Sequence, residues 1–139
     1  MEILIIDDDS NDRIILGKYL AKCKITKSSI HSVSSINGAE EVLLKKNIDV
    51  IFLDLKLENT EGAETFDAVE KIAQEYSSSK PAIIILSGTK NYKMAKELLH
   101  KGALKFLSKD GLRPKDLQRC INGVLVQRSL PKRKKFNLF

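Results

Sequence analysis

Aspartates follow two apolar runs of this sequence, at the points where strands of a sheet would end. Asp7, Asp8 and Asp9 come directly after the run at 3–6, and Asp54 follows the run at 50–53. Carboxylates that converge from neighbouring strands repel one another, and their pKa values rise unless a cation lies between them. A hard divalent ion such as Mg²⁺, which takes oxygen ligands and keeps several waters, suits such a group. The spacing therefore predicts a magnesium site.

A hydroxyl and an ammonium follow two further apolar runs. Ser87 comes after the run at 82–86. Lys109 follows Ser108 at the end of a shorter run at 106–107. Alone, each residue type is weak evidence, because Ser often caps turns and helices and Lys is usually solvated. Together with the carboxylates they supply positive charge and a hydroxyl donor, which are the groups that stabilise a transferring phosphoryl group.

Five short apolar runs alternate with stretches of helical periodicity. Four of the runs are rich in Ile, Val, Leu or Phe, which is typical of strands buried on both faces. The run at 30–33 is interrupted by His31 and Ser32, as expected of a half-exposed edge strand. The predicted strands are 3–6, 30–33, 50–53, 82–86 and 106–107. The predicted helical stripes are Ile15, Leu16, Tyr19, Leu20 and Cys23; Val42 and Leu43; Phe66, Val69, Ile72 and Ala73; Tyr92, Ala95, Leu98 and Leu99; and Leu117, Cys120, Ile121, Val124 and Leu125.

Capping signals predict where several of these helices begin and end. Ser10 is the predicted N-cap of the first helix, and Asn37 with Glu40 resembles a capping box for the second. Gly102 can end the fourth helix in a left-handed conformation, and Pro114 suits the first turn of the fifth.

Five strand–helix units in about 127 residues predict an α/β fold with a parallel sheet covered on both faces. Right-handed crossovers leave few topologies. We expect a doubly wound five-stranded sheet of order 2-1-3-4-5 with five helices, which is the flavodoxin-like arrangement. Its functional crevice lies at the carboxyl ends of the strands, beside the switch point between strands 1 and 3.

Composition fits one domain. The chain has 139 residues and no apolar run near the roughly 20 residues that cross a bilayer. No signal peptide is evident, so we expect a cytoplasmic protein.

Cys23 and Cys120 are expected to be buried small hydrophobes. Five of the six net positive charges lie in 128–139, so we predict a domain over 1–127 and a basic, flexible tail over 128–139, without a basic binding face on the domain itself.

The motifs Asp7-Asp8-Asp9, Phe52-Leu53-Asp54, Leu86-Ser87-Gly88 and Phe106-Leu107-Ser108-Lys109 resemble those of the receiver domain of bacterial two-component response regulators. The resemblance covers residues 2–127. It implies that Asp54 is the phosphoryl acceptor, attacking the phosphohistidine of a histidine kinase or phosphotransfer protein. It also implies that Asp7 and Asp8 hold Mg²⁺ with Asp54 and the backbone carbonyl of Lys56.

The resemblance further implies a switch. Lys109 would pair with Asp54 and then with the phosphate, Ser87 would bond a phosphoryl oxygen, and Phe106 would fill the space that Ser87 leaves. The altered surface of the fourth helix, fifth strand and fifth helix would control a downstream protein, whose identity is unknown, or form a homodimer. The chain would carry no DNA-binding domain and would not be an enzyme beyond phosphorylating and dephosphorylating itself.

Three residues near these motifs need their own interpretation. Asp9 is expected to face solvent or cap the first helix. Lys56 stands where the family often has a neutral or smaller residue; its side chain is either solvated or lies over the phosphoryl site and changes the lifetime of the acyl phosphate. Asp110 replaces a proline that is common in the family, so we predict a trans peptide bond after Lys109.

Two other functions compete with this one. A phosphohydrolase of the haloacid dehalogenase type would use Asp7 as nucleophile and Asp9 as its acid–base partner, but it needs a further acidic motif, and only Asp110 and Asp116 follow Lys109. A receiver that serves as a constitutive interaction module is the second alternative. The complete set of acidic, hydroxyl and ammonium groups argues against it.

Overall fold

The computed structural model describes residues 1–25, 29–77, 80–88 and 90–129. The strands are β1 (Glu2–Ile6), β2 (Ser29–Val33), β3 (Val50–Asp54), β4 (Ala82–Ser87) and β5 (Lys105–Ser108). The helices are α1 (Ser10–Ala21), α2 (Ile36–Lys45), α3 (Ala63–Tyr76), α4 (Tyr92–His100) and α5 (Pro114–Ser129). The strands form one parallel sheet of order β2-β1-β3-β4-β5, so the predicted fold is confirmed.

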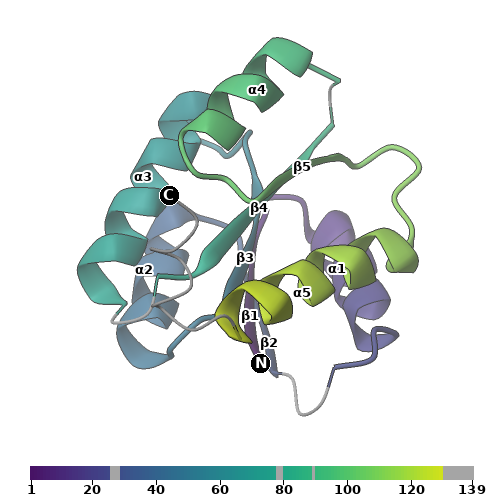
Figure 1. Cartoon of the computed structure of the whole chain (residues 1–139). Helices are drawn as coiled ribbons and strands as arrows, with labels where there is room; N and C mark the ends of the chain where they lie inside the picture. The colour runs from purple at the N-terminus through teal and green to yellow at the C-terminus, as the bar shows by residue number, and fades with distance from the viewer. Residues whose placement is uncertain (26–28, 78–79, 89, 130–139) are drawn as a thin grey trace, which may run out of the picture.

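Helices cover both faces of the sheet, with α1 and α5 on one face and α2, α3 and α4 on the other (Figure 1). The alternation along β1 explains why its residues are all apolar. Leu4 and Ile6 belong to the cluster beneath α2 and α3, whereas Ile3 and Ile5 belong to the cluster beneath α1 and α5. A strand buried on both faces needs apolar side chains at every position.

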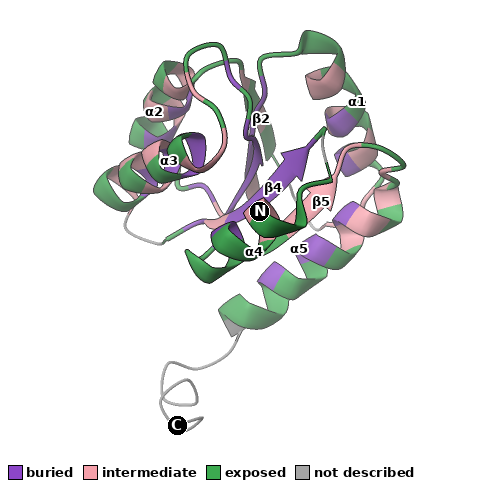
Figure 2. Cartoon of the chain, turned by 90° about the horizontal axis from the view of Figure 1, so that it is seen from above, coloured by how far each residue is buried: buried purple, intermediate pink, exposed green. Residues whose placement is uncertain are grey.

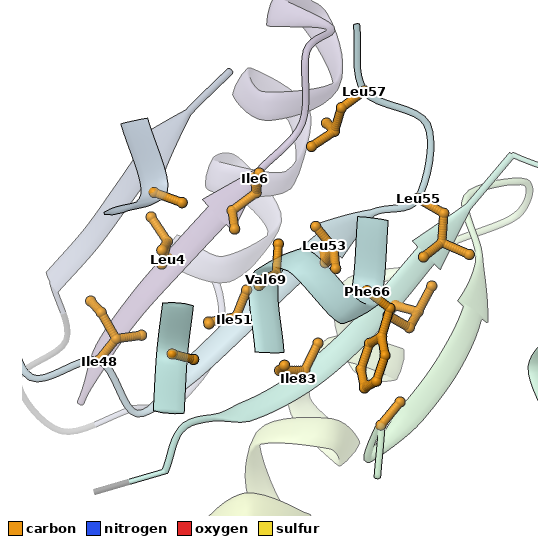
Figure 3. Packing of buried hydrophobic residues seen from close by; sticks show 14 of the residues in the cluster. Leu4, Ile6, Ile48, Ile51, Leu53, Leu55, Leu57, Phe66, Val69 and Ile83 are labelled. Atoms are coloured by element: carbon orange, nitrogen blue, oxygen red, sulfur yellow. The ribbon is translucent and has the colours of Figure 1, made fainter. Parts of the chain in front are cut away.

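The core beneath α2 and α3 is built around Phe66 and Val69, which are fully buried. Figure 3 shows them beside Ile51, Leu53 and Ile83 of the central strands. Burial of such side chains contributes on the order of 2 kcal/mol each. This packing fixes the strands whose ends carry the polar groups.

The sheet edges differ from its centre, as Figure 2 shows by burial. β2 is exposed or half-buried along its length, which confirms the predicted edge strand. His31 lies 2.8 Å from the Glu2 carboxylate on the neighbouring strand. A polar pair of this kind is suited to a half-exposed surface.

Two predicted N-caps are wrong. Asp9, not Ser10, caps α1: its carboxylate accepts hydrogen bonds from the N–H groups of Asn11 and Asp12. Ser35, not Asn37, caps α2. In both cases the chain becomes helical earlier than predicted, and the cap must be the last extended residue before that point. The helix-capping interpretation of Asp9 is confirmed.

The predicted end of the fourth helix and the predicted start of the fifth agree with the structure. Gly102 follows α4 with a φ of +115°, which favours glycine, and α5 begins at Pro114. No cis peptide bond occurs in the described part of the chain, so the bond after Lys109 is trans as predicted. The helix α5 continues through Ser129, two residues into the predicted tail; residues 130–139 lie outside the described residues. Among the described helices, none has the length and apolar content to span a bilayer.

The predicted apolar stripe of α1 is only partly correct. Leu16 and Leu20 are buried against the sheet, but Ile15 is 48% exposed and its neighbour Ile14 is 55% exposed. Cys120 is buried as expected, whereas Cys23 is only half-buried, and both are free thiols. Thus α1 presents apolar side chains on its outer surface as well as to the core.

Charge is unevenly distributed along the fold. Residues 1–89 carry 15 acidic and 10 basic side chains, whereas residues 90–127 carry 3 acidic and 9 basic ones. The second segment contains α4, β5 and all but the last two residues of α5. The near-neutral domain predicted from the net charge is therefore made of an acidic part and a basic part.

Candidate functional site

The predicted site residues lie at the carboxyl ends of four neighbouring strands. Asp7 follows β1, and Asp54, Ser87 and Ser108 are the last residues of β3, β4 and β5. Parallel register aligns these ends, because Asp54 pairs with Leu86 and Ser87 pairs with Ser108. The residues that the sequence places far apart thus meet at one edge of the sheet, as predicted.

Three carboxylates form the acidic part of the site. Asp7 and Asp54 are buried, and Asp8 is exposed. One oxygen from each lies within 4.8 Å of the others. Burial raises the pKa of Asp54, and the charge of Asp7 raises it further, although the Lys56 N–H and the Lys109 ammonium act in the opposite direction. A cation would relieve this repulsion, so the group fits a hard divalent ion that prefers oxygen ligands.

Lys56 lies beside this group. Its backbone N–H donates a 3.1 Å hydrogen bond to Asp54 Oδ1, and its side chain is exposed. The residue also lines a hollow of about 350 Å³ together with Asp54. Its carbonyl remains a predicted metal ligand.

The Lys109 ammonium contacts three carboxylates at once. Its Nζ lies 2.7 Å from Asp7 Oδ2, 2.8 Å from Asp12 Oδ2 and 3.1 Å from Asp54 Oδ2. Burial lowers the pKa of Lys109, but the hydrogen bonds to Asp12 and Asp7 and the charge of Asp54 outweigh it and raise the pKa above its ordinary value. Lys109 is therefore charged and held at the centre of the site.

Sequence reasoning missed Asp12. It lies in the first turn of α1, where an acidic residue is usually explained by the helix dipole. Its contact with Lys109 spans 97 positions of the chain, so no local pattern could reveal it.

The start of α1 also fixes Asp7. Arg13 Nη1 donates a 2.7 Å hydrogen bond to the Asp7 carbonyl. The N–H of Asp9 donates to Asp7 Oδ1 at 2.9 Å. These bonds hold one oxygen of Asp7 toward the helix and leave Oδ2 for Lys109.

Ser87 and Phe106 line the same hollow as Asp54. Ser87 is 7% exposed, and Phe106 is half-buried against the core beneath α3 and α4. Gly62, which has a φ of +65°, precedes α3 at the same hollow. Gly88 also lines the hollow, and a Cβ atom at this position would meet no atom within 4 Å, so local packing does not require a glycine here.

The comparisons identify the family. Residues 3–122 match the family described as "Response regulator receiver domain". The chain belongs to this receiver family. Comparison of the sequence with curated proteins finds no match.

Solved structures of receivers share the fold. A two-component response regulator from Clostridium difficile has a TM-score of 0.77 at 19% identity, with 94% of this chain and 99% of that chain covered. A response regulator receiver domain protein from Clostridium thermocellum has a TM-score of 0.74 at 25% identity, with 91% and 95% covered. A CheY-like receiver from Methanospirillum hungatei JF-1 has a TM-score of 0.70 at 21% identity, with 91% and 94% covered.

Membership establishes the coarse function: a receiver is a phosphoacceptor signalling module. Such modules are typically not turnover enzymes. The described residues make up this one domain, and the acidic group at its strand ends could hold a metal ion.

Proposed function

We propose that this receiver accepts a phosphoryl group on Asp54, with Mg²⁺ held by Asp7, Asp8, Asp54 and the Lys56 carbonyl. The observation that carries the proposal is the position of Asp54: a buried carboxylate at the end of β3, 3.1 Å from Lys109 and within 4.8 Å of two further carboxylates. The metal would neutralise charge on the phosphoryl oxygens when bound.

In the proposed step an Asp54 carboxylate oxygen attacks the phosphorus of a phosphohistidine on a histidine kinase or phosphotransfer protein. A P–O bond forms and the P–N bond breaks. The imidazole nitrogen leaves with the bonding electron pair and takes up a proton. Lys109 neutralises charge on the phosphoryl group, and the Ser87 hydroxyl donates to one of its oxygens.

Phosphorylation then acts as a switch. Ser87 moves toward the phosphoryl group and Phe106 fills the space that it leaves, because both line the same hollow. Phe106 belongs to β5, so its movement alters the surface of α4, β5 and α5 that a downstream protein reads or that forms a homodimer. A local change of charge thus biases a two-state element.

The test is to incubate the chain with Mg²⁺ and acetyl phosphate and to map the modified peptide by mass spectrometry. We expect one phosphoryl group on Asp54, labile in alkali as an acyl phosphate is. Asp54→Asn should abolish labelling, and a Lys109→Ala variant should label far more slowly. Asp67→Asn is the matched control and should label normally, because it removes an exposed carboxylate of α3 that contacts Lys101 at the end of α4.

Label on Asp7 would instead support the phosphohydrolase chemistry and overturn the proposal. The same acetyl phosphate should label another receiver as a positive control. If it does and the folded wild-type chain takes up no label, the result would favour the constitutive interaction module.

A further inference from the structure

Lys109 makes its two shortest contacts with carboxylates other than the proposed acceptor. Asp7 and Asp12 lie at 2.7 and 2.8 Å, and Asp54 at 3.1 Å. Asp12 comes from α1 and is not part of the carboxylate group that could hold a cation. Its contact with Lys109 is therefore not explained by metal binding.

We infer that Asp12 is a positioning residue that holds the Lys109 ammonium toward α1 and so opposes its transfer to a phosphoryl group on Asp54. The inference rests on the proposed function. An ammonium has three N–H donors, and three carboxylate oxygens already surround this one. A phosphoryl oxygen must displace one of them to reach Lys109.

Asp12 is the carboxylate that competes most directly with the phosphoryl group. The Asp54 carboxylate would lose its charge on becoming an acyl phosphate, and Asp7 would share its charge with a bound cation. Asp12 does neither, so it keeps its full attraction for Lys109. It also lines the hollow above Asp54, where its negative charge repels an incoming phosphoryl group.

The position of the pair explains how Lys109 can move. Asp12 and Lys109 line both the hollow that contains Ser87 and a second hollow of about 360 Å³ beside Ile15 and Leu86. Open space on both sides allows the ammonium to swing from α1 toward the phosphoryl site. The side chains of Asp12 and Lys109 are 39% and 22% exposed, so solvent screens the pair and its effect is moderate.

The test measures binding of beryllium trifluoride, an anion that mimics a phosphoryl group, in the presence of Mg²⁺. Asp12→Asn should bind it about two- to fivefold more tightly than the wild type, as expected for loss of a partly exposed ion pair. Asp12→Glu keeps the charge and should remain close to wild type. Asp110→Asn removes an exposed carboxylate next to Lys109 that forms no ion pair with the Lys109 ammonium in the described part of the chain, and this variant is the control for general charge.

A second readout needs neither metal nor anion. The nuclear magnetic resonance signal of the Lys109 ammonium should exchange with water faster in Asp12→Asn than in the wild type, because one hydrogen-bond acceptor is weakened. Thermal unfolding checks that each variant is folded. A structural role alone would shift the melting temperature without changing this exchange relative to the control.

The inference would be overturned if Asp12→Asn and the wild type bound beryllium trifluoride with equal affinity. It would also be overturned if Asp110→Asn gained as much affinity as Asp12→Asn. If binding in either case still requires Asp54, the proposed function stands. Failure of the wild type to bind the anion, or binding that survives Asp54→Asn, would overturn the proposed function and the inference with it.

Discussion

The backbone N–H of Lys56 donates a hydrogen bond to Asp54 Oδ1 while the Lys56 side chain is exposed at the hollow above that carboxylate. The two parts of Lys56 therefore have separate effects. Its backbone N–H holds the proposed acceptor, and its exposed side chain is either solvated or placed over the phosphoryl site, where it would affect the approach of water.

Replacing the side chain should change the lifetime of the acyl phosphate but not its formation site. We expect the phosphorylated Lys56→Asn variant to lose its phosphoryl group faster than the wild type, because a shorter side chain opens the approach for water. Decay of phosphorylated protein after removal of the donor measures this. An unchanged decay rate would show that the Lys56 side chain is simply solvated.

The corrected cap of α1 can be tested by stability. Asp9→Ala should lower the free energy of unfolding by about 1 kcal/mol, since it removes the acceptor of two N–H groups. Ser10→Ala should have little effect, because Ser10 is the first helical residue and not the cap. Urea titration of both variants distinguishes the two residues. A larger loss for Ser10→Ala would contradict the assigned cap.

The two sides of α1 should respond differently to truncation. Leu20→Ala removes a side chain that is 1% exposed and should cost about 2–5 kcal/mol. Ile15→Ala, on the same helix but 48% exposed, should cost about 0.5 kcal/mol or less. Chemical denaturation of both variants and the wild type at one pH measures these losses of stability. Similar losses in both variants would mean that Ile15 is buried as its sequence pattern suggested.

Stability should depend on pH through Asp116 at the start of α5. Its hydrogen bond from the backbone N–H of Arg113 lowers the pKa of Asp116 below the ordinary value of 3.8. A lowered pKa in the folded state stabilises the protein above pH 3.8, and that contribution disappears as pH falls through the lowered value. Asp116→Ala should therefore unfold at lower urea than wild type at pH 7, and the difference should shrink in acid. If the stability difference between wild type and Asp116→Ala grew in acid, it would contradict a lowered pKa of Asp116 in the folded state.

The fold was predictable because its signals are local. Each buried strand is apolar along its length, and alternation with helical stripes leaves few topologies. The strand assignments also predicted that Asp7, Asp54 and Ser87 lie close together, since the carboxyl ends of parallel strands share one edge of the sheet. The role of Asp12 was not predictable, because it depends on how far Lys109 reaches across the site to α1.

Other errors have equally specific causes. The caps were shifted because several polar residues precede each helix, and only the backbone conformation decides which is the cap. Ile15 fits an apolar stripe by spacing, yet α1 has consecutive apolar residues at 14–16 and cannot bury all three against one sheet.

The charged residues are divided unevenly along the receiver, with net negative charge on residues 1–89 and net positive charge on residues 90–127. The positive stretch carries α4, β5 and most of α5, and in it 9 basic side chains outnumber 3 acidic ones. A negatively charged partner is then turned to face this side before contact, and the rate of productive encounter falls as salt screens the field. Orientation during diffusion would thus favour the side that the proposed switch would alter, at a distance beyond the reach of any hydrogen bond.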